Sequence, residues 1–263
     1  MNILIFIKQV PDTTDIRIDP ETNTLIRSGV KSVINPFDMY AIEEGIRLKE
    51  RLGTDIATYV ISMGPPQAEE AIREALSMGV DKGILLTDRR FAGSDTFATS
   101  YTLSLAAQKI GNFLLILTGK QASDGDTAQV GPGISEWLNI PLATYVRKIR
   151  EIHKEYAIVE RMTEEGYTVV KIPLPAVFTV VKEINEPRLP SIRGKLRAKK
   201  ANVEIWNADI LKAQSQYIGL NGSPTRVIKA YTPPARQRGE LFQGNIEDGI
   251  RELLKKLLSL IHI

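Results

Sequence analysis

Residues 113–132 read FLLILTGKQASDGDTAQVGP, an apolar run that ends in a bend of small residues before a helix start. An uninterrupted run from Phe113 to Leu117 is typical of a strand covered on both faces. Gly119 and the small residues after it predict a tight turn. A buried strand that leads through such a turn into a helix is the unit from which parallel sheets are built.

The same unit recurs along the first half of the chain. Strand patterns occur over 2–7, about 55–62 and about 83–87, and helices open at Asn35, at about 67 and near Ser94. Residues 15–19 and 24–27 alternate around a turn and predict a hairpin. Strands separated by helices call for right-handed crossovers, so the sequence predicts an α/β fold with a parallel sheet.

The helix that opens at Asn35 has a clear amphipathic pattern. Met39, Ile42 and Ile46 form its apolar stripe. Glu43 and Glu44 fall outside that stripe, and we expect both to face water.

The rhythm changes after Pro141. Segments 142–150, 156–161 and 167–172 predict a β-meander, and 175–180 predicts another buried strand. From Asn185 onward Pro, Gly, Lys and Arg are frequent, which predicts a segment without its own core that wraps another protein. We therefore expect a nucleotide-binding domain over 1–185 and a long C-terminal arm over 186–263, which ends in an amphipathic helix at about 246–260.

Composition narrows the classes of function. The chain has 263 residues, 43% of them hydrophobic, and a formal net charge of +3, so it is not a general nucleic-acid binder. The absence of cysteine excludes a thiolate metal site and a cysteine nucleophile, and two histidines are too few for a His-rich metal centre. The first apolar run is too short for a bilayer and precedes its lysine, so we expect a cytoplasmic protein without membrane insertion.

Ligands of open parallel sheets bind beyond the carboxyl ends of the strands, where helix N-termini offer free N–H groups. The chain has no P-loop and no Gly-x-Gly-x-x-Gly, which argues against P-loop NTPases and standard Rossmann dehydrogenases. After the fourth strand, the bend and the side chains of Thr127 and Gln129 suit a diphosphate. We expect Asp124 and Asp126 to cap the helix or bind N–H groups; an acid–base pair or a plain glycine turn stays open.

Two other junctions carry polar groups. Thr96 and Thr99 share one helix face, where hydroxyls suit a cofactor; plain capping by Ser94 or Asp95 is the alternative. The start at Asn35 suits the edge of an adenine, although Asn-Pro is a common helix start. The basic run over 191–200 lacks interleaved aromatic residues, so we expect a docking segment or solvated face and not an RNA site.

Over essentially its whole length the chain resembles the β subunits of electron-transfer flavoproteins. The residues that carry the likeness are Lys8 to Asp12, Asn35 to Asp38 with Ala41, Glu43 and Glu44, Met63 to Pro65, Ala75 to Gly79, Gly119 to Gln121, Val159 to Gly166, Pro175 to Val177 and Leu189 to Ile192. Thr168 and Phe178 depart from the family pattern, and neither lies at a nucleotide junction.

The resemblance implies an adenine-nucleotide-hydrolase-like, Rossmann-like fold in a heterodimer with an α subunit. In one branch the β chain holds a structural AMP. In the electron-bifurcating branch it holds an FAD that takes a hydride from NADH and sends one electron to ferredoxin or flavodoxin, the other to the FAD of the α subunit. Residues 124–132 and 95–99 resemble the bifurcating branch. A non-redox module that binds an adenine nucleotide is the remaining alternative.

The resemblance also assigns residues. Adenine and ribose would be held by Phe6, Asn35, Pro36, Phe37, Asp38 and Met63. The pyrophosphate would lie on Gly125, Asp126, Thr127, Ala128, Gln129 and Val130, beside Gly119 and Gln121, with the flavin near Asp95, Thr96 and Thr99. Leu189 would insert into an acyl-CoA dehydrogenase or similar flavoprotein acceptor, with Ile192, Arg193 and Lys195 around it. No catalytic side chain is expected, because a flavin carries the reaction itself.

Overall fold

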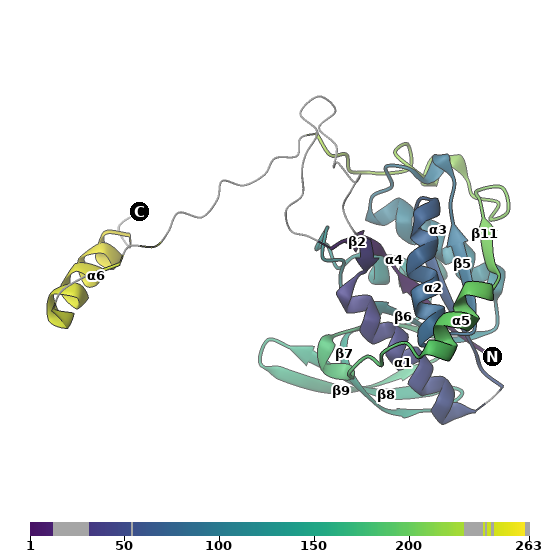
Figure 1. The fold of residues 1–263 in the computed structure, drawn as a ribbon, viewed down its shortest axis with the longest axis horizontal. Helices are drawn as coiled ribbons and strands as arrows, with labels where there is room; N and C mark the ends of the chain where they lie inside the picture. Colours follow the sequence, from purple (N-terminus) through teal and green to yellow (C-terminus); the bar gives the residue numbers. More distant parts are fainter. Residues whose placement is uncertain (13–31, 54, 229–238, 240, 243–244, 261–263) are drawn as a thin grey trace. The chain divides into compact units, whose positions relative to one another are not determined.

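The computed structural model describes residues 1–12, 32–53, 55–228, 239, 241–242 and 245–260. The chain divides into a unit over Met1–Lys229, which contains the sheet, and a second unit over Ala230–Ile263 (Figure 1). The hairpin expected over 15–19 and 24–27 lies outside the described residues.

Among the described residues, nine strands form one sheet with the order β11-β5-β4-β1-β6-β10-β7-β8-β9. The parallel strands are β1 (Asn2–Ile7), β4 (Ala57–Met63), β5 (Lys82–Leu86), β6 (Phe113–Gly119), β10 (Ala176–Val180) and β11 (Val203–Trp206). β7 (Leu142–Ile152) pairs with β10 in parallel and continues into an antiparallel meander with β8 (Tyr156–Thr163) and β9 (Gly166–Pro173). The predicted parallel sheet and β-meander are confirmed.

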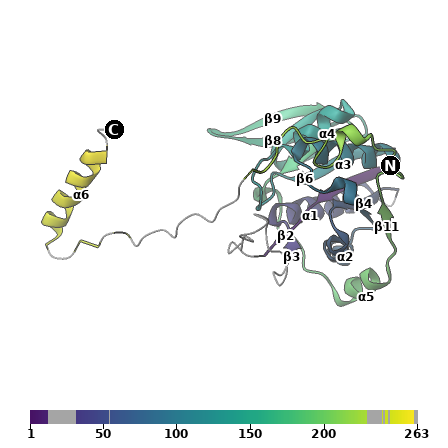
Figure 2. The same cartoon turned by 90° about the horizontal axis from the view of Figure 1, so that it is seen from above.

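Helices cover both faces of this sheet (Figure 2). α1 (Pro36–Leu52) and α2 (Glu69–Met78) lie on one face, and α3 (Thr96–Ile110) and α4 (Val130–Leu138) lie on the other. The side chains of Ile3 and Ile5 are buried with α1 and α2, and those of Leu4 and Phe6 with α3 and α4. Alternate side chains of a strand point to opposite faces, which explains the unbroken apolar run.

Short elements connect these layers. They are the antiparallel strands β2 (Gln9–Pro11) and β3 (Ser32–Ile34) and the 3₁₀ turns η1 (Pro66–Ala68), η2 (Arg89–Phe91), η3 (Lys182–Ile184) and η4 (Ser215–Tyr217). β2 follows β1 directly and β3 precedes α1, so this small ribbon adjoins the first strand-to-helix junction.

The first unit continues past the boundary expected at residue 185. α5 (Ile192–Lys200) packs on α2, and β11 pairs with β5 at the edge of the sheet. Ala198, Ala208 and Leu211 are buried in the cores of the two faces. Few apolar residues are needed to extend an existing core, so a segment without long apolar runs still joins it.

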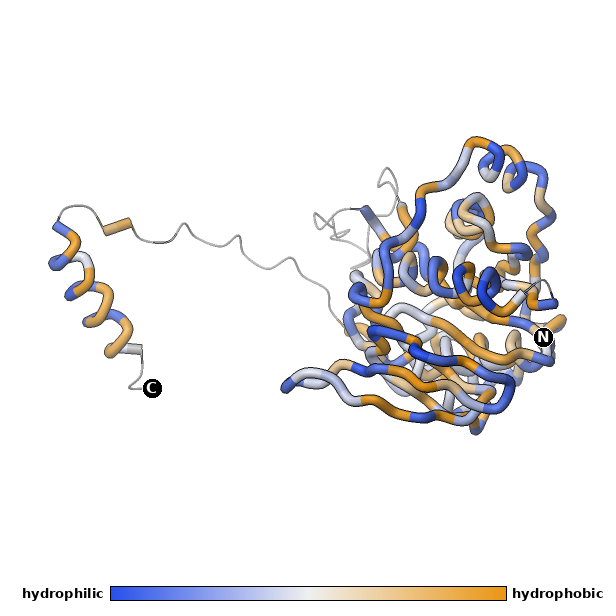
Figure 3. Tube along the Cα trace, turned by 90° about the horizontal axis from the view of Figure 1, so that it is seen from below, coloured by the Kyte–Doolittle hydropathy of each residue, from blue (hydrophilic) through white to orange (hydrophobic). Residues whose placement is uncertain are grey.

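The second unit contains α6 (Ile246–Leu260), the amphipathic helix expected at about 246–260. Its apolar side chains include Ile250, Leu253, Leu254 and Leu257, which are exposed. Hydrophobic and hydrophilic residues alternate along the helix (Figure 3). In the described part of the chain, every helix is too short or too polar to cross a bilayer.

Two acidic residues of α1 differ from the prediction. Glu43 and Glu44 were expected in water, whereas only 1% and 7% of their surface is exposed. Arg188 binds Glu43 and Asn185 binds Glu44, both from the segment after β10. The prediction from the helical pattern was wrong here, because partners from a distant segment offset the cost of burying the two carboxylates.

Candidate functional site

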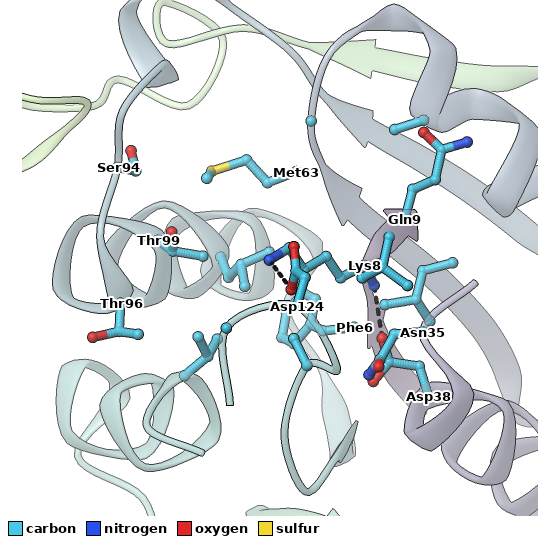
Figure 4. Close-up of a pocket in the computed structure, with 18 of the residues that line it drawn as sticks. Phe6, Lys8, Gln9, Asn35, Asp38, Met63, Ser94, Thr96, Thr99 and Asp124 are labelled. Atoms are coloured by element: carbon cyan, nitrogen blue, oxygen red, sulfur yellow. Dashed lines mark hydrogen bonds and ion pairs between the residues drawn. The ribbon is translucent and has the colours of Figure 1, made fainter. Parts of the chain in front are cut away.

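A cavity of about 1350 Å³ opens at the carboxyl ends of β1, β4, β5 and β6. This is where open parallel sheets bind their ligands. Figure 4 shows residues of β1 and α1 on one side, Thr96 and Thr99 of α3 on the other, and Asp124 between them. The space exceeds the usual size of a pocket for one small ligand, which is about 300–1,000 Å³.

The cavity brings together most of the residues assigned to a cofactor. Those that line it are Phe6, Asn35, Asp38, Met63, Asp95, Thr96, Thr99, Gly119, Gln121, Gly125, Thr127, Ala128, Gln129 and Val130. Pro36, Phe37 and Asp126 do not line it. The Phe37 ring lies under the ammonium of Lys120, at 4.9 Å from the ring centre, and the Asp126 carboxylate accepts from the side-chain amide of Gln121.

The bend between β6 and α4 offers backbone donors from its second half. The N–H groups of Gly125 and Asp126 both donate to the carbonyl of Ala122. By contrast, no acceptor among the described residues binds the N–H groups from Thr127 to Gly131. The pyrophosphate was assigned to Gly125 to Val130, and the structure narrows the free donors to the later residues.

The backbone at this point has the shape of an anion-binding nest. Asp126 and Ala128 have φ of 57° and 55°, and Gln129 follows in the right-handed helical region at φ −99°. A left-handed residue beside a right-handed one turns successive N–H groups toward a common point. Ala128 is strained there, because an L residue pays about 1–2 kcal/mol in this conformation.

Asp124 and Asp126 were expected to cap the helix or to bind N–H groups of the turn, but neither caps the helix. α4 begins after Gln129 without a side-chain cap. Asp124 instead accepts from the ammonium of Lys8 at 2.7 Å, and Asp126 is bound by Gln121. Each carboxylate therefore has a side-chain partner, and the helix N-terminus stays open to the cavity.

Asn35 ties α1 to the same bend. Its amide donates to the carbonyl of Gln121 at 2.8 Å, and its carbonyl oxygen accepts from the N–H of Ser123 at 3.1 Å. The side chain is only 1% exposed. Both ends of the amide are thus used within the chain, so Asn35 shapes the wall and its amide is not free to read an adenine edge.

Asp38 joins two strand ends at the floor of the cavity. Its carboxylate accepts from the N–H of Lys8 at 2.7 Å and from the N–H of Gly119 at 3.1 Å. Burial raises the pKa of this carboxyl to about 7, although the two N–H groups act in the opposite direction. Near neutral pH the charge at the cavity floor therefore depends on pH.

On the opposite wall, Asp95 is the N-cap of α3, so the capping alternative is confirmed. Its carboxylate accepts from the N–H groups of Phe97 and Ala98, and also from the hydroxyl of Thr225 at 2.8 Å. Thr96 and Thr99 line the cavity, and their hydroxyls have no hydrogen-bond partner within the described ranges. These two hydroxyls remain available to a ligand.

Lys8, Arg89 and Thr225 are among the cavity residues that were not assigned from the sequence as site residues. Lys8 directly follows β1, so the rule that ligands sit beyond strand ends could have found it. Arg89 follows β5 and has no ion-pair partner in the described part of the chain. Thr225 lies 130 positions from Asp95, and no local pattern marks it. Within the described residues, no group of acidic or histidine side chains is arranged to hold a metal ion.

Comparison with known proteins gives one consistent result. The model of the electron transfer flavoprotein domain matches residues 22–211. The chain is 52% identical over 260 residues to the electron transfer flavoprotein subunit beta of Thermoanaerobacterium thermosaccharolyticum, which covers 98% of both chains. It is 44% identical to the caffeyl-CoA reductase-Etf complex subunit CarD of Acetobacterium woodii over 100% of both chains. Protein FixA of Sinorhizobium fredii is 42% identical over 99% of this chain and 93% of its own length.

Proposed function

The chain belongs to the electron transfer flavoprotein family as a β subunit, and we propose that it holds an FAD in the cavity at the sheet edge and oxidises NADH as part of an electron-bifurcating complex. The observation that carries this proposal is the extent of one continuous cavity. It reaches from the free N–H groups at Ala128 and Val130 to the free hydroxyls of Thr96 and Thr99.

The donor groups present fit a dinucleotide. N–H groups at a helix N-terminus that make no hydrogen bond within the chain suit a diphosphate. The carboxylate of the bend that lines the cavity, that of Asp124, is neutralised by Lys8. The opposite wall offers the hydroxyls of Thr96 and Thr99. AMP has no ribityl chain or flavin that could bind them, whereas FAD has both. This distribution favours FAD over AMP.

Each wall then has its own role. The ends of β1 and β4, at Phe6 and Met63, would hold adenine and ribose, with Asp38 and Asn35 fixing the backbone around them. Residues 127–131 would bind the diphosphate. Thr96 and Thr99 would orient the flavin end. An FAD held there would accept hydride from NADH and release electrons singly, one to ferredoxin or flavodoxin and one to the FAD of the α subunit.

The proposal assigns no side chain to covalent catalysis. Hydride and electron transfer need positioning and electrostatic tuning rather than a nucleophile. Asp38 is a titrating group at the cavity floor, and its buried carboxyl would influence the charge around the adenine half. The protein acts as an oxidoreductase through the group it binds.

Two relatives favour the bifurcating branch as a proposal. CarD is named as a subunit of a complex of caffeyl-CoA reductase with an electron transfer flavoprotein, and FixA proteins match over most of this chain. By analogy, this chain would pair with an α subunit through its second unit, over 230–263, and would deliver electrons to an acyl-CoA dehydrogenase-type flavoprotein.

The surface for that acceptor is the group of Leu189, Ile192 and Leu196, which we call the docking surface. Their side chains are 89%, 82% and 60% exposed. Exposed Arg193 and Lys195 flank them, so the complementary partner is an apolar pocket with an acidic rim.

Anaerobic mixing of the purified heterodimer with NADH tests the function. We expect NADH to bleach flavin absorbance, and ferredoxin reduction to require the acyl-CoA dehydrogenase and its substrate at the same time. Leu189→Ala should leave flavin reduction intact and slow transfer to the dehydrogenase. If NADH reduces no flavin, the chain is not the NADH-oxidising subunit.

A further inference from the structure

The segment just before the docking surface is bound to α1 through several side chains. Asn185 donates to the carboxylate of Glu44 at 3.0 Å and to the carbonyl of Tyr40 at 3.1 Å. Arg47 of α1 donates to the carbonyl of Glu186 at 3.0 Å. Leu189 therefore follows a stretch of chain that is bound to α1 at Asn185 and Glu186.

Arg188 is the centre of this attachment. Its guanidinium donates to Glu43 at 2.8 Å and to Glu50 at 2.6 Å, and its own N–H donates to Glu43 at 3.1 Å. A planar guanidinium can bind two carboxylates in fixed directions, which a lysine cannot do. Side chain and backbone of Arg188 are thus held together, one residue before Leu189.

The carboxylate at the base of this network is buried. Glu43 is 1% exposed. Burial alone would raise the pKa of Glu43, but hydrogen bonds from Arg188 and Arg47 together lower it below the usual value. A buried ionised pair that loses one member is strongly unfavourable, so this attachment does not open easily.

The far side of the docking surface is fixed as well. Ser191 caps α5 by accepting from the N–H of Gly194 at 2.9 Å. Arg73 of α2 donates to the carbonyl of Ala198 at 2.6 Å. A side chain at Gly194 would overlap the carbonyl of Ser77, so α5 lies directly against α2. Leu189 is exposed between two anchored ends.

We propose that Arg188, held by Glu43 and Glu50, is the positioning residue of the docking surface: it keeps Leu189 extended toward the acceptor before the acceptor arrives. Binding costs less when the interacting side chain is already ordered, because the ordering entropy is not paid on association. This inference rests on the proposed docking role of Leu189. It adds that the rigidity of the loop, and not only its apolar side chain, sets the affinity.

The test uses the αβ heterodimer and a purified acyl-CoA dehydrogenase as acceptor. We expect Arg188→Ala to raise both the dissociation constant and the KM for the dehydrogenase roughly ten-fold, with kcat nearly unchanged. NADH-dependent reduction of a small tetrazolium dye, which needs no docking, should stay at the wild-type rate. Unchanged affinity for the dehydrogenase would overturn the inference.

Two further variants separate positioning from folding. Glu50→Ala removes only the outer half of the network and leaves Glu43 paired, so it should fold normally and still weaken docking. Arg188→Lys keeps the charge but loses the two-carboxylate geometry, and should bind nearly as weakly as Arg188→Ala. Wild-type affinity in both would contradict a positioning role. Arg150→Ala is the matched control, because it removes an arginine from another buried carboxylate, Glu160, outside the docking segment.

A double-mutant cycle with Leu189→Ala shows through which residue Arg188 acts. If Arg188 positions Leu189, Arg188→Ala should add little in a chain that already carries Leu189→Ala. Fully additive losses would mean that Arg188 contacts the acceptor independently and would overturn the inference. If Leu189→Ala leaves docking intact, both the docking role of Leu189 and the positioning role of Arg188 are wrong. If Leu189→Ala weakens docking but Arg188→Ala leaves it intact, only the positioning role of Arg188 is wrong.

Discussion

The carboxylate of Asp38 and the backbone of Gly119 lie in direct contact at the floor of the cavity. Oδ1 of Asp38 accepts from the N–H of Gly119 at 3.1 Å, and a Cβ at position 119 would overlap that same oxygen. Oδ2 accepts from the N–H of Lys8. The first turn of α1 thereby joins the ends of the neighbouring strands β1 and β6 at the floor of the cavity.

Gly119→Ala is therefore expected to destabilise the chain. The added methyl meets Asp38 and the backbone of Phe37, and overpacking of this kind costs about 1–3 kcal/mol. Gly125→Ala is the control, because a Cβ there meets no protein atom within 4 Å. Denaturant unfolding without added nucleotide should show the loss for Gly119→Ala only; equal stabilities of the two variants would refute the packing argument.

Asp38 also predicts a pH dependence of stability. Its pKa is about 7 in the folded chain against 3.8 for the free side chain, so the folded state binds more protons between these values. The free energy of unfolding contributed by Asp38 should therefore fall as pH rises from about 4 to about 7, and stay level above.

Asp38→Asn removes this titration. The unfolding free energy of the wild type minus that of Asp38→Asn, measured by denaturant at several pH values, should fall as pH rises through that window. A difference that is constant from pH 4 to 8 would show that burial does not shift the carboxyl. The pH dependence from Asp88 has the opposite sign, because its pKa is lowered to about 2. The stability that Asp88 contributes is complete above the usual pKa of 3.8 and is lost as pH falls toward 2.

If the bend after β6 binds the diphosphate, substitutions in this bend should weaken the binding of FAD. Gly125 lines the cavity, and a Cβ there would meet no other protein atom within 4 Å. The valine of Gly125→Val would therefore occupy the cavity itself and should abolish retention of FAD by this subunit. Thr127→Val leaves the backbone donors in place and should weaken FAD only about five-fold, the cost of one hydrogen bond. Full FAD affinity in both variants, measured by fluorescence titration, would place the diphosphate elsewhere.

The fold followed from the sequence because its strands are buried on both faces. Continuous apolar runs such as 2–7 and 113–117 have few other uses, and the junctions after them had to lie at one edge of a parallel sheet. The cap at Asp95 was also readable, since Asp95 and the N–H groups it accepts lie within one helical turn.

Contacts between distant segments were not readable. The partner of Asp124 is Lys8, and that of Glu43 is Arg188, 145 positions away. Charged residues that pair across the fold look like solvated residues in a local pattern, which is why Glu43 was expected in water. β11 was missed for a similar reason: Val203 and Trp206 pack against the core only because residues 203–206 pair with β5.

Thr96 and Thr99 are expected to distinguish FAD from AMP. If their hydroxyls contact the flavin end, Thr99→Val and Thr96→Val should each weaken FAD about five-fold and leave AMP affinity unchanged. Thr102→Val on the same helix is the control, because the Thr102 hydroxyl donates to the carbonyl of Ala98 and does not line the cavity. Equal losses for FAD and AMP, measured by calorimetric titration, would put these threonines in the adenine half.

Counting the nucleotides released from the purified αβ heterodimer tests the central claim most directly. Acid extracts separated by chromatography should contain two FAD per heterodimer and no AMP, because one FAD is expected in each subunit. One FAD with one AMP would contradict the account: the cavity of this chain would then hold a structural nucleotide, and oxidation of NADH would not take place in this subunit.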